Sequence, residues 1–158
     1  MDISPKKIIN LAFKKQFRIS VAESCTGGLL TASLTEIPGS SEVIDRGYVT
    51  YSNQSKLDLL NVKKSTLNQH GAVSAETAKE MALGALENSY SQLSISITGV
   101  AGPSHSEQKE VGLVYFGWAG IQVPNDSEHV NFGNLGRQII RLKSVEYAIH
   151  ILYRILKI

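Results

Sequence analysis

Apolar positions along the chain follow two different spacings in turn. In some segments they recur every three or four residues, which places them on one face of a helix. In others they alternate with polar residues or run together, as in strands. The helical spacing predicts helices at residues 8–15, 27–34, 53–60, 75–89 and 136–156. The other pattern predicts strands at residues 18–22, 44–51, 93–97 and 111–118, with an edge strand at 129–132.

The predicted helices and strands alternate, which indicates an α/β fold with helices on both faces of a mixed sheet. Residues 112–130 resemble a hairpin, so the sheet need not be entirely parallel. The 158 residues contain no internal repeat and no Gly/Ser/Pro-rich linker, so we expect one domain over residues 1–158. The apolar stripe of the last helix suits a core face or a contact between subunits, so a homo-oligomer is one expectation.

The composition of the chain mainly excludes classes of protein. Hydrophobic residues make up 42% and charged residues 19% of the chain, as in ordinary globular proteins. A net charge of +2 and the absence of any block of like charges give no reason to expect direct nucleic-acid binding. The only cysteine, Cys25, excludes an internal disulfide. The chain has neither a long apolar run nor the features of a secretion signal, so we expect a cytoplasmic protein without membrane association.

The first candidate for chemistry is residues 23–28, Glu-Ser-Cys-Thr-Gly-Gly, between a predicted strand and a predicted helix. Ligands favour this end of the strands in open α/β sheets, and free backbone N–H groups there suit a phosphate or an oxyanion. The alternative interpretation is structural: a Ser/Thr helix cap followed by close packing at two glycines.

Residues 38–41, Pro-Gly-Ser-Ser, form a turn with paired serines, and residues 46–56 lead a strand into a short helix that carries Lys56. A serine attacks well only when a nearby base takes its proton, and a lysine can do so only when burial or another cation lowers its pKa. The alternative for Lys56 is a solvated helix lysine. Tyr51 either orients a substrate ring or is an ordinary tyrosine at the core edge.

Two further segments are weaker candidates. Residues 98–103, Thr-Gly-Val-Ala-Gly-Pro, follow a strand directly and form either a ligand wall or a simple turn. Arg137 and Arg141 stand one turn apart at the start of the last helix, where they suit a phosphate or lie on an exposed polar face. The four histidines are scattered without metal-ligand spacing, so we expect no metal and no cofactor.

These segments together resemble the CinA C-terminal-domain family, whose stand-alone members are nicotinamide-nucleotide amidohydrolases. The resemblance rests on residues 23–28, 38–41, 46–53 with Lys56, 71–74 (Gly-Ala-Val-Ser) and 98–103, which fall in the family's order and spacing. It covers about residues 5–155. It implies a three-layer α/β/α sandwich with a mixed, mostly parallel central sheet.

The resemblance also implies an activity and a set of site residues. The activity is hydrolysis of nicotinamide mononucleotide to nicotinic acid mononucleotide and ammonia by a serine–lysine mechanism without metal. The implied catalytic residues are Ser41, Lys56, Ser24 and Tyr51, with Ser41 as the preferred nucleophile and Ser24 relaying the proton or binding substrate. The implied substrate-binding residues are Glu23, Cys25, Thr26, Gly27, Thr98, Gly99 and Arg137, of which the arginine suits the 5′-phosphate.

The chain departs from the family pattern in two places. Residues 104–110 lack two glycines that family members usually carry, and the approach to Arg137 lacks the usual Gly-Asp-Arg. Both changes fall near the expected phosphate end of the site. The altered loop favours an alternative function, a non-catalytic nucleotide-binding module in a competence or DNA-damage assembly. A nucleotide phosphohydrolase would need a carboxylate cluster for metal, which the sequence does not show.

Overall fold

A computed structural model describes residues 3–158 of the chain. Its five strands form one sheet in the order β2-β1-β3-β4-β5. The strands are β1 (Ile19–Glu23), β2 (Ile44–Val49), β3 (Leu93–Gly99), β4 (Leu113–Gly120) and β5 (Asp126–Asn131). β1 lies parallel to both β2 and β3, whereas β4 is antiparallel to β3 and to β5. The predicted mixed sheet with a parallel part is therefore confirmed.

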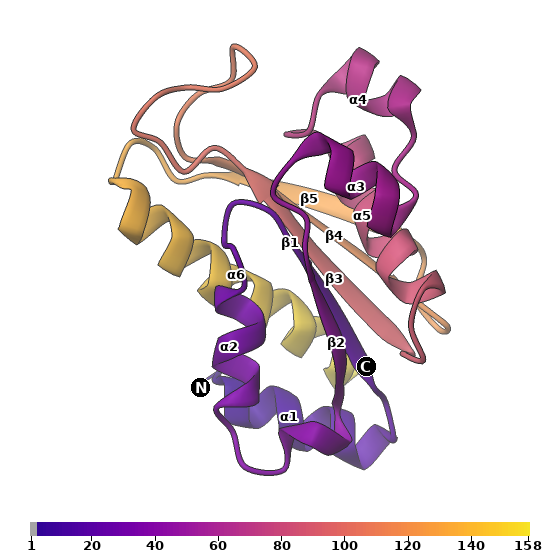
Figure 1. Cartoon of the computed structure of the whole chain (residues 1–158). Helices are drawn as coiled ribbons and strands as arrows, with labels where there is room; N and C mark the ends of the chain where they lie inside the picture. The colour runs from indigo at the N-terminus through magenta and orange to yellow at the C-terminus, as the bar shows by residue number, and fades with distance from the viewer. Residues whose placement is uncertain (1–2) are drawn as a thin grey trace.

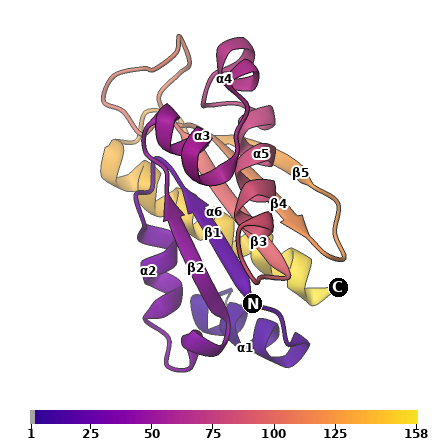
Figure 2. The ribbon, with the colours of Figure 1, turned by 45° about the vertical axis from the view of Figure 1, so that its right-hand side comes forward.

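Helices cover both faces of this sheet and complete three layers (Figures 1 and 2). One layer contains α1 (Pro5–Lys15), α2 (Leu29–Thr35) and α6 (Arg137–Lys157), which pack against one another. The other contains α5 (Ala75–Glu87), which packs on β3 and β4, and α3 (Asn53–Leu60) and α4 (Lys64–His70), which pack on α5. A short 3-10 helix, η1 (Ser40–Glu42), leads into β2. None of the helices in residues 3–158 is long and apolar enough to cross a membrane.

The parallel strands bring three separate segments of the chain to one edge of the sheet. In the register of β1, Glu23 lies beside Val49 of β2 and Ile97 of β3. The segments that follow these three strands therefore start at the same carboxyl edge, the usual ligand-binding edge of an open α/β sheet. The segment that precedes β2 lies at the opposite, amino edge, because Ile44 pairs with Ile19 at the start of β1.

Sequence patterns missed α4 and η1 and placed some boundaries wrongly. α4 has no buried residue, so it carries no apolar stripe that could reveal it. α2 begins at Leu29 rather than residue 27, because Gly27 and Gly28 have φ of 58° and 107° and form a turn. β5 begins at Asp126, earlier than the predicted edge strand, because its exposed polar residues conceal the alternation.

Glu23 ends β1 as a fully buried carboxylate that caps the β1–α2 connection. Its two oxygens accept hydrogen bonds from the hydroxyls of Thr26 and Thr31, at 2.6 and 2.7 Å, and from two backbone N–H groups of α2. Four donors thus satisfy a charge that would be costly to bury alone. The assignment of Glu23 to substrate binding is therefore corrected: its carboxylate is used inside the fold.

Close packing of α5 on α3 sets the position of the helix that carries Lys56. A Cβ atom on Gly84 of α5 would lie 1.8 Å from the carbonyl oxygen of Leu60, the last residue of α3. Only glycine allows the two helices to approach this closely.

We expect Gly84→Ala to lower the free energy of unfolding by about 1–3 kcal/mol, because overpacking outweighs the roughly 1 kcal/mol by which alanine favours a helix. Urea denaturation measures the difference. Leu83→Ala, at a 37% exposed neighbouring position of the same helix, is the control and should cost less. A Gly84→Ala variant as stable as the wild type would contradict the close helix contact.

Glu23→Gln should lower the free energy of unfolding by about 1–3 kcal/mol, because the amide NH₂ would face two hydrogen-bond donors whichever way it turns. Glu36→Gln, at the exposed C-cap of α2, is the matched control and should change stability by less than about 0.5 kcal/mol. A Glu23→Gln protein with unchanged stability and weakened substrate binding would restore the substrate-binding assignment.

Candidate active site

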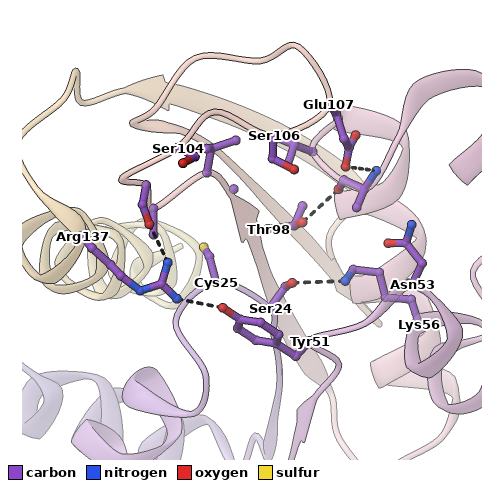
Figure 3. Close-up of a pocket in the computed structure, with 16 residues that line it drawn as sticks. Ser24, Cys25, Tyr51, Asn53, Lys56, Thr98, Ser104, Ser106, Glu107 and Arg137 are labelled. Carbon is purple, nitrogen blue, oxygen red and sulfur yellow. Dashed lines mark hydrogen bonds between the residues drawn. The ribbon is translucent and has the colours of Figure 1, made fainter.

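A pocket of about 350 Å³ opens at the carboxyl edge of the parallel strands (Figure 3). Its wall is built from the segments after β1, β2 and β3, the α4–α5 connection and the first residue of α6. The lining side chains that carry polar or reactive groups are Ser24, Cys25, Tyr51, Asn53, Lys56, Thr98, Ser104, Ser106, Glu107 and Arg137.

Ser24 and Lys56 meet at the floor of this pocket. Ser24 directly follows β1, and its N–H is anchored to the carbonyl of Ile97 in β3 at 2.9 Å. The side chain of Ser52 caps α3 by accepting from the N–H of Ser55, so Lys56 lies in the first turn of that helix. The Nζ of Lys56 donates to Ser24 Oγ at 3.1 Å and to the carbonyl of Thr50 at 2.8 Å.

The environment of Lys56 raises the fraction of its amine that is neutral. The residue is 1% exposed, and within residues 3–158 no carboxylate forms an ion pair with it. Burial lowers the pKa of Lys56 from 10.5 to about 8, while the nearby Cys25 and Glu107 act in the opposite direction. At pH 7 about a tenth of the amine is therefore unprotonated and can accept the proton of a hydroxyl at bonding distance.

Cys25 follows Ser24 and also lines the pocket, but its thiol is not activated. Burial raises the pKa of Cys25 to about 12, with smaller opposing effects from its own backbone, Arg141 and Lys56. A thiol with this pKa stays protonated near neutral pH and is a poor nucleophile. The side chain of this segment that is hydrogen-bonded to Lys56 is the hydroxyl of Ser24.

Arg137 lies across the pocket from Lys56, and Tyr51 lies between them (Figure 3). Arg137 donates to the carbonyl of Gly102 at 2.7 Å and to the hydroxyl of Tyr51 at 2.7 Å. Tyr51 is 60% exposed, and its hydrogen bond is made to Arg137 rather than to Ser24 or Lys56. Its position suits contact with substrate more than proton transfer.

Thr98 and Gly99 lie at the end of β3 and form the back wall. The Thr98 side chain is almost completely buried, and its hydroxyl donates to the carbonyl of Ala72 at 2.9 Å. A Cβ on Gly99 would lie 2.8 Å from the carbonyl oxygen of Leu113 in β4, so glycine is required for packing at this position. Thr98 therefore ties the wall to the α4–α5 connection.

Ser41 does not reach the pocket. It lies in the exposed η1 turn before β2, where its carbonyl accepts from Arg18 at the start of β1. β1 rises about 3.3 Å per residue, so its five residues place Ser41 and Ser24 at ends of the strand roughly 16 Å apart. The preference for Ser41 as nucleophile is therefore corrected, because the serine next to Lys56 is Ser24.

Thr26 and Gly27 also lie outside the pocket lining. Thr26 is fully buried and its hydroxyl is bonded to Glu23, and Gly27 provides a left-handed turn residue on the outer side. Of the residues assigned to substrate binding, the structure therefore brings together Cys25, Thr98, Gly99 and Arg137, and it places Glu23, Thr26 and Gly27 in the supporting turn.

Sequence reasoning missed four polar residues of the lining: Asn53, Ser104, Ser106 and Glu107. Asn53 lies three residues before Lys56 in α3, so helical spacing could have revealed it. The other three belong to the β3–β4 loop, which has no regular period. Glu107 Oε1 accepts from the N–H of Ala72 at 3.0 Å, and this contact holds the loop over the pocket.

No group of three or more His, Cys, Asp or Glu side chains in residues 3–158 is arranged to hold a metal ion. The chemistry that the lining itself offers is that of a buried amine beside a hydroxyl, with a guanidinium on the opposite side.

Known proteins share both this sequence and this fold. Residues 2–156 match the family described as the CinA C-terminal domain. A provisionally named competence-damage inducible protein from Caldanaerobacter subterraneus subsp. tengcongensis is 47% identical over 151 residues, which are 95% of this chain and 36% of that protein. A CinA-like protein from Leptospira borgpetersenii serovar Hardjo-bovis is 42% identical over 153 residues, which are 96% of this chain and 36% of that protein. The chain thus spans about a third of the length of these curated relatives.

Solved structures give the same result. The crystal structure of the competence/damage inducible protein CihA from Agrobacterium tumefaciens has a TM-score of 0.88 at 41% identity and is covered over 100% of both chains. A CinA superfamily protein from Escherichia coli has a TM-score of 0.92 at 30% identity, covering 98% of this chain and 90% of that chain. The match extends over nearly every residue, and the chain belongs to the CinA C-terminal domain family.

Proposed function

We propose that this chain is an amidase that hydrolyses the carboxamide of nicotinamide mononucleotide, with Ser24 as nucleophile and Lys56 as general base. The observation that carries the proposal is the 3.1 Å hydrogen bond between the buried Lys56 Nζ and Ser24 Oγ inside the pocket. Serine needs a base to become nucleophilic, and a lysine whose pKa burial has lowered to about 8 is such a base.

The first half of the reaction transfers the acyl group to Ser24. Neutral Lys56 takes the hydroxyl proton as Ser24 Oγ attacks the carboxamide carbon, and the C=O electron pair moves onto the oxygen. The N–H groups of Cys25 and Thr26 lie directly after Ser24 and would stabilise this oxyanion. Collapse of the intermediate breaks the C–N bond, and Lys56 returns the proton to the leaving nitrogen, which departs as ammonia.

The second half restores the enzyme. Lys56 is neutral again after ammonia leaves, so it can take a proton from a water molecule that attacks the ester carbon. The second tetrahedral intermediate releases the carboxylic acid, and the proton passes from Lys56 back to Ser24. The net change is carboxamide plus water to carboxylic acid plus ammonia, which become carboxylate and ammonium near neutral pH, with no oxidant required.

The charges of the pocket suit a mononucleotide with a phosphate at one end. Arg137 lies across the pocket from Lys56, and its planar guanidinium matches the oxygen atoms of a phosphate. The cavity volume, about 350 Å³, lies within the range of small-ligand sites. Tyr51 is held by Arg137 and offers an aromatic face beside the path between the two charged groups.

A second candidate is a nucleotide-binding module without catalysis. Its supporting observation is the β3–β4 loop, in which Ser104, Ser106 and Glu107 line the pocket and the two glycines expected from the family resemblance are absent. Such a protein would keep the pocket and bind nucleotide without releasing ammonia.

The amidase is tested by ammonia release from nicotinamide mononucleotide. Ser24→Ala and Lys56→Met should each lower kcat/KM by roughly 10³-fold or more, because each removes half of a nucleophile–base pair. Ser41→Ala is the matched control and should stay within about threefold of the wild type, and EDTA should have no effect.

A wild-type protein that binds the nucleotide without releasing ammonia would support the binding module instead, and loss of activity in Ser41→Ala would return the nucleophile to Ser41.

The pH dependence follows from the lowered pKa of Lys56. The base acts only when neutral, so kcat/KM should rise about tenfold per pH unit below pH 8 and level off above it. Measurements above about pH 6.5 keep the substrate phosphate in its dianionic form. Lys56→Arg is the control: its side chain stays charged over this range, so the variant should be inactive at every pH. A wild-type kcat/KM that does not change between about pH 6.5 and 9 would contradict Lys56 as the base.

A further inference from the structure

Arg141 lies one turn after Arg137 on α6, but it is not part of the pocket lining. Its guanidinium instead binds the turn that follows Ser24. Nε donates to the carbonyl of Cys25 at 3.1 Å, and Nη2 donates to the carbonyl of Thr26 at 3.2 Å. Arg141 therefore contacts the backbone beside the proposed nucleophile from the α6 side, away from α3 and Lys56.

The turn that Arg141 holds has two possible orientations of its central peptide. The N–H of Gly27 donates to the carbonyl of Ser24 at 3.0 Å, which closes a four-residue β-turn over residues 24–27. The two common forms of such a turn differ mainly by a flip of the peptide between the second and third residues. Thr26 does not have a positive φ, so the turn is not type II. Arg141 stabilises the observed orientation through the carbonyl of Cys25.

This orientation decides where the N–H groups point. In a planar trans peptide the C=O and the N–H point in opposite directions. Because the Cys25 carbonyl faces Arg141, the Thr26 N–H points away from the guanidinium. Among the described residues, neither the Cys25 N–H nor the Thr26 N–H donates to another residue, although both belong to a well-packed turn. Neither N–H group therefore has an acceptor in another of these residues. Cys25 lines the pocket, and the fully buried Thr26 follows it directly.

Gly27 supplies the space that this arrangement needs. Its φ of 58° is left-handed, and a Cβ on this residue would lie 3.3 Å from Arg141 Nη2. A side chain at position 27 would therefore both strain the turn and crowd the guanidinium.

We propose that Arg141 is a positioning residue that holds the Cys25–Thr26 peptide so that the N–H groups after Ser24 form the oxyanion hole. The inference rests on the proposed amidase function and extends it to a residue outside the pocket. A negative oxygen develops only as the amide carbon becomes tetrahedral, so correctly aimed donors stabilise the transition state more than the bound substrate.

The first experiment separates kcat from KM for ammonia release from nicotinamide mononucleotide. Arg141→Ala should lower kcat by roughly 10²-fold with KM within about threefold, because it misaligns donors that act in the transition state. Arg141→Lys should recover part of this loss, because one ammonium can still reach one carbonyl. Arg137→Ala is the contrasting variant and should mainly raise KM. Thermal melts of both Arg141 variants test whether the fold is kept.

The second experiment does not depend on amidase activity. Phenylboronic acid forms a tetrahedral adduct with an activated serine, and one boron oxygen then occupies the oxyanion position. Its Kd should be at least roughly tenfold weaker in Arg141→Ala than in the wild type, and binding should be lost in Ser24→Ala. Boron NMR reports the tetrahedral adduct directly.

The outcomes separate the two proposals. If the wild type forms the boronate adduct but releases no ammonia, nicotinamide mononucleotide is not the substrate. The role of Arg141 is then tested by comparing the boronate Kd of the wild type with that of Arg141→Ala. Equal boronate affinity in the wild type and Arg141→Ala, or a folded Arg141→Ala with unchanged kcat, would overturn the positioning role. If Arg141→Ala unfolds, the same comparisons with Arg141→Lys decide: unchanged kcat and boronate affinity would overturn the proposal. A wild type that forms no adduct at Ser24 would overturn it as well.

Discussion

This site depends on the burial of the Lys56 amine, which forms no ion pair with any carboxylate of the described residues 3–158. A protein usually pairs a buried charge, and an unpaired ammonium responds to burial by losing its proton more easily. Lys56 is held in this situation by a serine hydroxyl and a backbone carbonyl, both of which can remain hydrogen-bonded whether the amine is charged or neutral. An ion pair would have kept the amine protonated and inactive as a base, so the proposed mechanism requires that Lys56 form none, as is the case within residues 3–158.

The fold supplies this environment through its parallel strands. β1 and β2 end beside each other, so the residues after β1 and the helix after β2 meet at one edge without any long-range adjustment. α3 packs closely on α5 at Gly84. In this position of α3, the Lys56 side chain reaches Ser24 at the edge of the sheet. α6 contributes its two arginines from the opposite layer, so one helical layer brings an amine and the other two guanidinium groups to the same edge.

The sequence was sufficient for the fold class and for most of the pocket. The order and spacing of the motifs, through their resemblance to the CinA C-terminal domain family, assigned Lys56, Ser24 and Arg137 to the site. The residue patterns alone had left a structural alternative open for each. Sequence alone could not separate Ser24 from Ser41, because only the strand register shows that the two serines lie at opposite ends of β1. The same limit applies to Glu23, whose carboxylate could face the pocket or the fold until the position of α2 was known.

The β3–β4 loop holds two non-glycine residues in a left-handed conformation. Glu107 and Gln108 have φ of 54° and 60°, a left-handed conformation that costs non-glycine residues roughly 1–2 kcal/mol each. The loop offsets this cost with a tight turn, in which the Lys109 N–H donates to the carbonyl of Ser106 at 2.8 Å. It also has side-chain contacts that glycine could not make: Glu107 accepts from Ala72, and Lys109 donates to the carbonyls of His70 and Val73. Hydrogen bonds of its own charged residues therefore hold the loop in position, and the loop still forms part of the pocket wall. This finding weakens the main sequence argument for a non-catalytic protein.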